Sequence, residues 1–199
     1  MSEITRRDAV RRLALALTAT GFIDRVAAEE VHAMASQAAA AAGGNYTPKT
    51  FTAAQFKTLE RLADIIIPVE DGKPGALAAA CPAWIDTISS ENDDLKARYA
   101  KGFAWLDEAM KKRGANDFTS APAADQTALV DVIAYRKNAS PETTTGIEFF
   151  ALVRRMTVDA FYTSEIGIKD IDYRGNSPMA SYPAPTEAIA YALKRSGLG

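Results

Sequence analysis

Apolar side chains recur at the spacing of an α-helix in five separate segments of this chain, and no useful length alternates apolar with polar residues as a strand does. The clearest helix follows Thr52, because Gln55, three residues later, completes a capping-box arrangement. Pro68 ends this helix, since proline has no N–H to donate and disfavours helical geometry at Ile67. The other expected helices are residues 76–89, with Pro82 as a break or restart, 95–112 before Gly114, 125–137 and 148–162. The sequence therefore predicts an all-α fold, an irregular bundle of about five helices.

Most of the expected helices have one apolar face, and these faces form the candidate core. Their residues are Phe56, Leu59, Leu62, Ala63 and Ile66; Tyr99, Phe103, Leu106 and Met110; Leu129, Val132 and Ile133; and Phe149, Leu152, Val153, Met156 and Ala160. A chain of 199 residues is long enough for one substantial core and short for two. We place this helical domain at residues 46–199, after an N-terminal extension at 1–45.

The charge balance and the length of one apolar run indicate whether the chain could bind nucleic acid or span a membrane. With 23 Lys and Arg against 25 Asp and Glu, the formal charge is -2, so no basic field is available to hold a phosphate backbone. The apolar run at Leu13–Ile23 is shorter than the roughly 20 residues that a membrane-spanning helix needs. We expect neither nucleic-acid binding nor a transmembrane segment.

The chain has one cysteine, Cys81, and one histidine, His32, which excludes several kinds of site. Four-Cys zinc and iron–sulfur sites need more thiolates, and c-type haem attachment needs a C-x-x-C-H motif. A Ser-His or Cys-His site would have to recruit His32, which precedes the expected domain. We expect no cofactor, metal or catalytic residue in this chain. Cys81 precedes Pro82 in an apolar segment and is expected to be buried, with a disulfide to a partner as the alternative.

The first residues have the layout of an export signal. Arg6 and Arg7 follow Thr5 and precede the apolar run, as in a twin-arginine signal, whose receptor reads the arginines as an address. A second pair, Arg11 and Arg12, gives the alternative of an amphipathic N-terminal helix with a basic stripe. Ala33-Met34-Ala35 is a passable cleavage site. The twin-arginine reading predicts a periplasmic location.

The acidic corner after the first helix is interpreted as structure. Asp64, Glu70, Asp71 and Gly75 do not have the alternating spacing of an EF-hand, and no glutamate closes the loop. We expect Gly72 and Gly75 to permit a turn and Asp64 to hydrogen-bond a turn amide. Two further groups have similar readings: Ser164 is a helix-end hydrogen bonder, and the acidic run Glu91, Asp93 and Asp94 is a solvated loop.

A long stretch rich in Gly, Pro, Asn, Ser and Tyr, residues 167–185, is predicted to be an irregular arm before a last short helix capped by Thr186. Large apolar and aromatic side chains on an extended arm are good interface material, because they bury much area at modest entropic cost. The alternative is that the arm folds back on its own bundle. The candidate interface residues are Ile168, Ile171, Tyr173, Met179 and Tyr182.

Two stretches carry a resemblance to a known family: FTAAQFKTLERLADIIIPVEDGKPGA at residues 51–76 and IEFFALVRRMTVDAFYTSEIGIKDIDYRGN at residues 147–176. In this combination and order they resemble the gluconate 2-dehydrogenase subunit 3 family, the small subunits of periplasmic flavoprotein sugar dehydrogenases. The resemblance covers most of the helical domain, and each piece alone is weak.

The resemblance implies a helical, non-catalytic subunit of a heteromeric oxidoreductase complex. It implies that the partner is a GMC-type catalytic dehydrogenase subunit that contains FAD, oxidises a sugar or sugar acid and passes electrons to a cytochrome c. In such complexes the small subunit commonly bears the twin-arginine signal, which Arg6 and Arg7 match. The chain would then bind, stabilise and escort its partner to the periplasm. The competing interpretation is a free-standing helical adaptor without a redox link.

Overall fold

The computed structural model describes residues 32–33, 46–175 and 184–196, and this part of the chain is helical without strands. The elements are α3 (Ala53–Ile66), α4 (Cys81–Ser89), α5 (Asp93–Lys111), α6 (Ala123–Ile133), a 3-10 turn (Arg136–Asn138), α7 (Thr144–Tyr162), α8 (Glu165–Asp170) and α9 (Thr186–Ser196). The all-α prediction is confirmed: the five expected helices are present, and α8 and α9 follow them. The signal-like extension at 1–45 lies outside the described residues except for His32 and Ala33.

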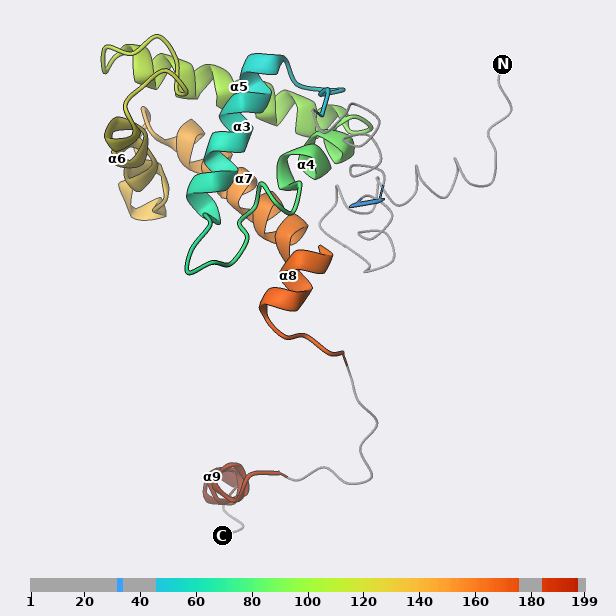
Figure 1. The fold of residues 1–199 in the computed structure, drawn as a ribbon. Coiled ribbons are helices and arrows are strands. Elements are labelled where there is room, and N and C mark those ends of the chain that lie inside the picture. Colours follow the sequence, from blue (N-terminus) through green and yellow to red (C-terminus); the bar gives the residue numbers. More distant parts are fainter. Residues whose placement is uncertain (1–31, 34–45, 176–183, 197–199) are drawn as a thin grey trace.

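Helix α7 is the centre of the body, and α3, α4, α5, α6 and α8 all pack against it (Figure 1). Aromatic rings join α5 to α7, with the centroids of Tyr99, Phe103 and Phe149 between 5.2 and 6.0 Å apart. A side chain at Gly102 would overlap the Phe149 ring, so glycine there lets the two helices approach closely. The residues predicted for the core are buried, except that Ile66 and Val132 are only half-buried.

Both ends of α3 form as the sequence predicts. The Thr52 side chain accepts a hydrogen bond from the Gln55 N–H, and the Gln55 side chain accepts one from the Thr52 N–H, which is the reciprocal capping box. At the other end, the Ile67 N–H still donates to the Ala63 carbonyl at 2.9 Å, and the chain then leaves helical geometry before Pro68. The local signals in this segment are sufficient to define the helix.

Helix α4 starts later than expected and is buried along its whole length. It begins at Cys81 because Pro82 fits only in the first turn, where its missing N–H has no intrahelical partner to lose. Ala80, just before the helix, has a left-handed φ of 52°, which turns the chain into it. All nine residues of α4 are buried, so the helix is an inner element of the bundle.

Helix α5 starts earlier than expected because of a cap at Asn92. The Asn92 side chain accepts a hydrogen bond from the Leu95 N–H at 2.9 Å, so the helix begins at Asp93. The acidic run is therefore solvated as predicted but not a loop throughout: Asp93 and Asp94 are exposed in the first helical turn, where carboxylates favour the positive end of the helix dipole.

The next two helices also differ from the expected bounds. Helix α6 ends at Ile133 instead of residue 137, and the Asn138 side chain donates to the Val132 carbonyl at 2.8 Å. Helix α7 starts at Thr144 instead of residue 148. The sequence prediction missed its first turn because Thr144 and Gly146 lack the apolar spacing that marks the rest of the helix. At the end of α5, Gly114 has a left-handed φ of 88°, as the helix stop there predicts.

A buried carboxylate that the sequence analysis did not single out, Asp86 of α4, holds the segment before α3. It accepts hydrogen bonds from the backbone N–H groups of Lys49, Thr50 and Phe51 at 2.7, 3.0 and 3.0 Å. The Tyr46 hydroxyl donates to it at 2.8 Å. Asp86 is fully buried, and this cradle of donors replaces the hydration that burial removes. Residues 46–51 are thereby packed as part of the body.

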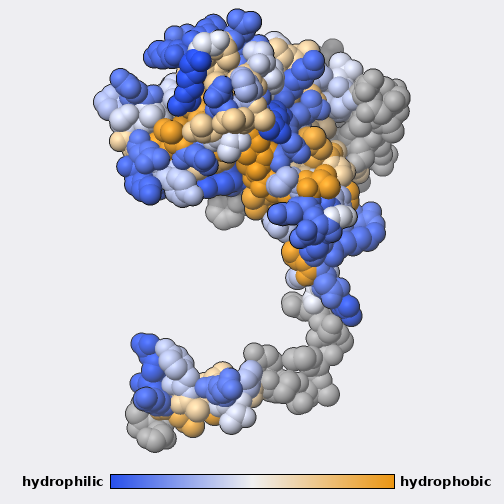
Figure 2. All heavy atoms as spheres, turned by 60° about the vertical axis from the view of Figure 1, so that its left-hand side comes forward, coloured by the Kyte–Doolittle hydropathy of each residue, from blue (hydrophilic) through white to orange (hydrophobic). Residues whose placement is uncertain are grey.

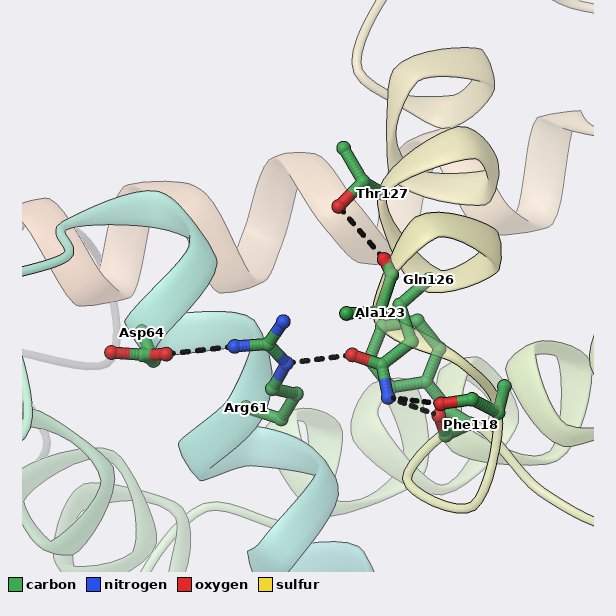
Figure 3. Close-up of polar contacts among 7 residues, drawn as sticks. Arg61, Asp64, Phe118, Ala123, Gln126 and Thr127 are labelled. Atoms are coloured by element: carbon green, nitrogen blue, oxygen red, sulfur yellow. Dashed lines mark hydrogen bonds and ion pairs between the residues drawn. The ribbon is translucent and has the colours of Figure 1, made fainter.

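Arg61 connects α3 to α6 and to the loop before α6 (Figure 3). Its Nε donates to the Gln126 side-chain oxygen at 2.6 Å, and the Gln126 amide donates to the Phe118 and Ala121 carbonyls at 2.9 and 3.0 Å. Its Nη1 pairs with Asp64 at 2.8 Å. The expectation that Asp64 bonds a turn amide is therefore wrong, because an arginine three residues earlier lies on the same helix face.

The Cys81 side chain is buried, as predicted, and the burial raises the pKa of its thiol to about 12. We expect the folded chain to react with a thiol reagent at pH 8 at least about a hundredfold more slowly than the chain in denaturant, because only the thiolate is nucleophilic. A colorimetric thiol assay with and without denaturant measures this. Rapid labelling of one thiol per folded chain would contradict the burial.

Helix α9 forms where the sequence predicts a last short helix, but Thr186 is its first residue and not its cap. None of its residues is buried, and Ile189, Tyr191 and Leu193 are among the exposed large apolar side chains. Across the ranges that the structure describes, no helix is long and apolar enough to cross a bilayer.

Candidate partner-binding surface

The corner between α3 and α4 is a tight hairpin built by Asp71 and Gly72. Both have left-handed φ, 49° and 77°, and the flanking residues Glu70 and Lys73 exchange backbone hydrogen bonds of 3.3 and 2.8 Å. Asp-Gly favours such two-residue turns because both central positions need positive φ. The prediction that the corner is a structural turn is confirmed. No group of three or more His, Cys, Asp or Glu in the described ranges could hold a metal ion.

The corner is closed tightly against the end of α3. The Ala76 N–H donates to the Ile67 carbonyl at 2.8 Å. A side chain at Gly75 would come within 2.5 Å of the Ile67 carbonyl oxygen and 2.7 Å of the Pro68 backbone, so glycine is needed there for packing. The backbone of the corner is thus packed directly against the end of α3.

Helix α8 is attached just as closely to the end of α7. The Ser164 hydroxyl donates to the Phe161 carbonyl at 2.6 Å and accepts from the Gly167 N–H at 3.0 Å, so Ser164 is the N-cap of α8. This confirms its predicted role at a helix end. A side chain at Gly167 would overlap the Phe161 backbone, so α8 packs directly on the last turn of α7.

The corner and α8 meet across a groove. The Lys73 ammonium lies 3.0 Å from the Asp170 carboxylate and joins the two elements. A groove of about 380 Å³ lies between them and the end of α7. It is lined by Ile66, Ile67, Pro68, Glu70, Asp71, Lys73, Pro74, Phe161, Tyr162 and Asp170. Two parts of the chain that are about a hundred residues apart therefore form one surface.

Exposed apolar side chains gather on the elements around this groove. Of the ten large apolar residues that are exposed in the described part of the chain, five lie on the corner, on the last turns of α7 or just after α8, and three more are on α9. Figure 2 shows hydrophobic surface on the body near the point where α8 and the chain beyond it emerge. We call this the corner–α8 surface and define it by Val69, Val158, Tyr162, Ile171 and Tyr173.

The predicted interface residues fall partly on this surface. Ile171 and Tyr173 are 53% and 52% exposed, and Ile168 is half-buried. Met179 and Tyr182, like Arg6 and Arg7, lie outside the described residues. The arm is not irregular from residue 167 as expected, because α8 continues to Asp170. The sequence identifies Ser164, the cap of α8, as a helix-end residue but does not predict the short helix α8 itself.

Sequence reasoning also missed the contributions of Val69, Val158 and Tyr162. Val158 and Tyr162 are one helical turn apart on the exposed side of α7. The apolar spacing marks the buried face of this helix and gives no signal for its exposed side. Val69 follows Pro68 in a stretch that reads as a turn. No local signal relates these three positions. Tyr162 lines the groove together with Pro68 and Glu70, the chain neighbours of Val69, and this proximity arises only from tertiary packing.

Residues 53–182 match the family described as gluconate 2-dehydrogenase subunit 3. The chain belongs to this family. The match confirms the resemblance inferred from the sequence and covers well over half of the chain. No curated protein and no solved structure matches the chain.

The gluconate 2-dehydrogenase subunit 3 match places the candidate surface within the family region. It begins at the first residue of α3 and includes the corner, α8, Ile171 and Tyr173. Helix α9 and the first 52 residues lie outside it. The family description names one subunit of a dehydrogenase with several subunits, which agrees with an accessory chain in such a complex.

Proposed function

We propose that this chain is the non-catalytic small subunit of an FAD-dependent sugar or sugar-acid dehydrogenase. It binds, stabilises and escorts the catalytic subunit to the periplasm. The partner is a GMC-type flavoprotein that holds the FAD and oxidises the sugar, and a cytochrome c subunit receives the electrons. The observation that carries this proposal is the corner–α8 surface, which lies within the region matched by a dehydrogenase-subunit family.

The composition of the corner–α8 surface supports protein binding. Exposed apolar clusters mark interaction sites, and tyrosine is enriched in interfaces because it buries a large ring and keeps a hydroxyl for hydrogen bonding. Charged pairs lie on the same two elements: Lys73 of the corner pairs with Asp170 of α8, and Lys169 pairs with Glu165 within α8 at 2.6 Å. An apolar centre with a charged rim is the usual anatomy of a protein–protein interface.

The proposal assigns the FAD to the catalytic subunit and not to this chain. The sequence contains no G-x-G-x-x-G segment with which a dinucleotide is held at a helix N-terminus. The competing function, a free-standing adaptor without a redox link, would leave the surface for a different kind of partner.

Capture from native cells tests the proposal. Full-length tagged chain should co-elute with a second protein that carries flavin absorbance, at a fixed ratio of the two chains. The small subunit, separated from that complex, should carry no flavin. Elution of the chain alone, or of a partner without flavin, would favour the adaptor, and stoichiometric FAD on the separated small subunit would contradict the assignment of the cofactor.

Changing Arg6 and Arg7 together to lysine should keep both this chain and the catalytic subunit in the cytoplasm, because the export receptor reads arginines at that place. The helical body should fold normally, since both residues precede it. Cell fractionation followed by immunoblotting measures the effect. The matched control changes the second pair, Arg11 and Arg12, to lysine and should export normally. Normal export of the catalytic subunit with the first variant would rule out the escort role.

A further inference from the structure

His32 precedes the helical domain in sequence, but its ring contacts the body of the fold. Its Nε2 lies 3.1 Å from the Thr163 hydroxyl oxygen at the end of α7. Its ring centroid is 5.8 Å from that of Trp84 on α4, with the planes tilted by 32°. In Figure 1, residues 32 and 33 are the short blue segment beside α4. The contact joins positions 131 residues apart, far beyond any local interaction.

The neighbours of the Thr163 hydroxyl indicate an anchor and not a catalytic pair. This hydroxyl donates to the Asp159 carbonyl of its own helix at 2.6 Å, and the direction of its 3.1 Å contact with His32 Nε2 depends on the tautomer of the ring. Burial lowers the pKa of His32, although the Ala160 carbonyl opposes this shift. The contact therefore positions the chain.

The surface that receives His32 is built from inner parts of the bundle. Trp84 is fully buried on a helix that is buried along its whole length, and its indole Nε1 has no hydrogen-bond partner among the described residues. Thr163 is the residue that ends α7, one position before the Ser164 cap of α8. The ring of His32 thus lies at the junction of α4 and α7 and contacts a residue of each, Trp84 and Thr163.

We infer that Trp84, Ala160 and Thr163 form a docking site for the N-terminal segment of the same chain, with His32 as the anchoring residue. A segment held in this way stays with the folded subunit. Ala33, Met34 and Ala35 follow the anchor directly, so a peptidase could cleave after Ala35 only by taking the docked residue away. This consequence rests on the proposed export of the chain, whereas the docking itself does not.

Nuclear magnetic resonance of the purified full-length chain, with any affinity tag removed, tests the docking without reference to export. The chain has one histidine, so its imidazole signals are assigned directly. We expect nuclear Overhauser contacts from the His32 ring to the Trp84 indole, and slow exchange of the ring N–H proton with solvent. A ring without these contacts, with the chemical shifts of an unstructured peptide, would overturn the docking site.

A variant and a matched control separate docking from general folding. His32→Ala should raise solvent exchange of the Trp84 indole N–H by about tenfold or more, because local opening exposes what the ring covers. Ala33→Ser changes the neighbouring exposed residue and should leave the exchange as in the wild type. Equal exchange in His32→Ala and wild type would overturn the role of His32.

The intact mass of the subunit, captured with its partner from native cells, tests the consequence for processing. We expect a chain that begins before His32. A chain that begins at Ser36 would overturn the retention of the anchor. Failure to capture a flavoprotein would contradict the proposed function instead, and the nuclear magnetic resonance result would stand independently.

Discussion

Alanine in place of Tyr162 or Tyr173 should weaken the complex with the catalytic subunit by about tenfold to a hundredfold for each variant, which is the usual range for aromatic residues central to an interface. Both side chains are exposed in the isolated subunit, at 42% and 52%, and belong to the corner–α8 surface. Their truncation removes little from the core, so we expect the melting temperature of the isolated subunit to change by only a few degrees. Titration calorimetry on the purified subunits measures the affinity, and thermal unfolding measures the stability.

Tyr135 provides the matched control for these variants. It is a similarly exposed tyrosine, at 57%, and lies after α6, outside the corner–α8 surface. Tyr135→Ala should leave the affinity unchanged. The proposed surface would be wrong if Tyr135→Ala weakened binding as much as Tyr173→Ala did. It would also be wrong if both surface variants kept the wild-type affinity.

Alanine in place of Asp86 should destabilise the isolated subunit by at least about 3 kcal/mol, because several buried donors lose their acceptor at once. The donors are the N–H groups of Lys49, Thr50 and Phe51 and the Tyr46 hydroxyl. For a domain of this size we expect a fall in melting temperature of about 10 °C. Calorimetry or thermal unfolding followed by circular dichroism measures it.

Two further substitutions make the Asp86 result specific. Asp86→Asn keeps the shape and one acceptor oxygen but turns an N–H toward other donors, so its stability should lie between wild type and alanine. Asp131→Ala changes an exposed aspartate in the last turn of α6 and should shift the free energy of unfolding by no more than about 0.5 kcal/mol. A wild-type melting temperature for Asp86→Ala would show that residues 46–51 are not held as the structure indicates.

The candidate surface shows how far the sequence reaches. The long arm with Ile171 and Tyr173 was recognised as interface material from its composition, and both residues are exposed. The corner was recognised as a turn from Pro68, Asp71 and Gly72. The sequence does not predict that the corner and α8 lie side by side. The Lys73–Asp170 contact and the groove beside it depend on how α8 packs on α7.

The sequence by itself determined the features that depend on neighbouring residues. Apolar spacing of three and four identifies the buried face of a helix, and the Thr52–Gln55 capping box and Gly114 mark where helices begin and end. These interactions act within about one helical turn, so a single sequence records them. They were enough for the all-α fold and for the core residues of α3, α5 and α7.

Tertiary structure alone decided which distant groups meet. Asp86 reaches the backbone of residues 49–51, at least 35 positions away, and His32 reaches Thr163 across 131 positions. The residues next to Asp86 and His32 in the sequence do not indicate their hydrogen-bond partners. An aspartate in an apolar helix and a histidine in an alanine-rich segment have the same local sequence whether or not they have a partner. Their roles follow from burial, because removing a polar group from water requires that the fold supply its hydrogen-bond partner.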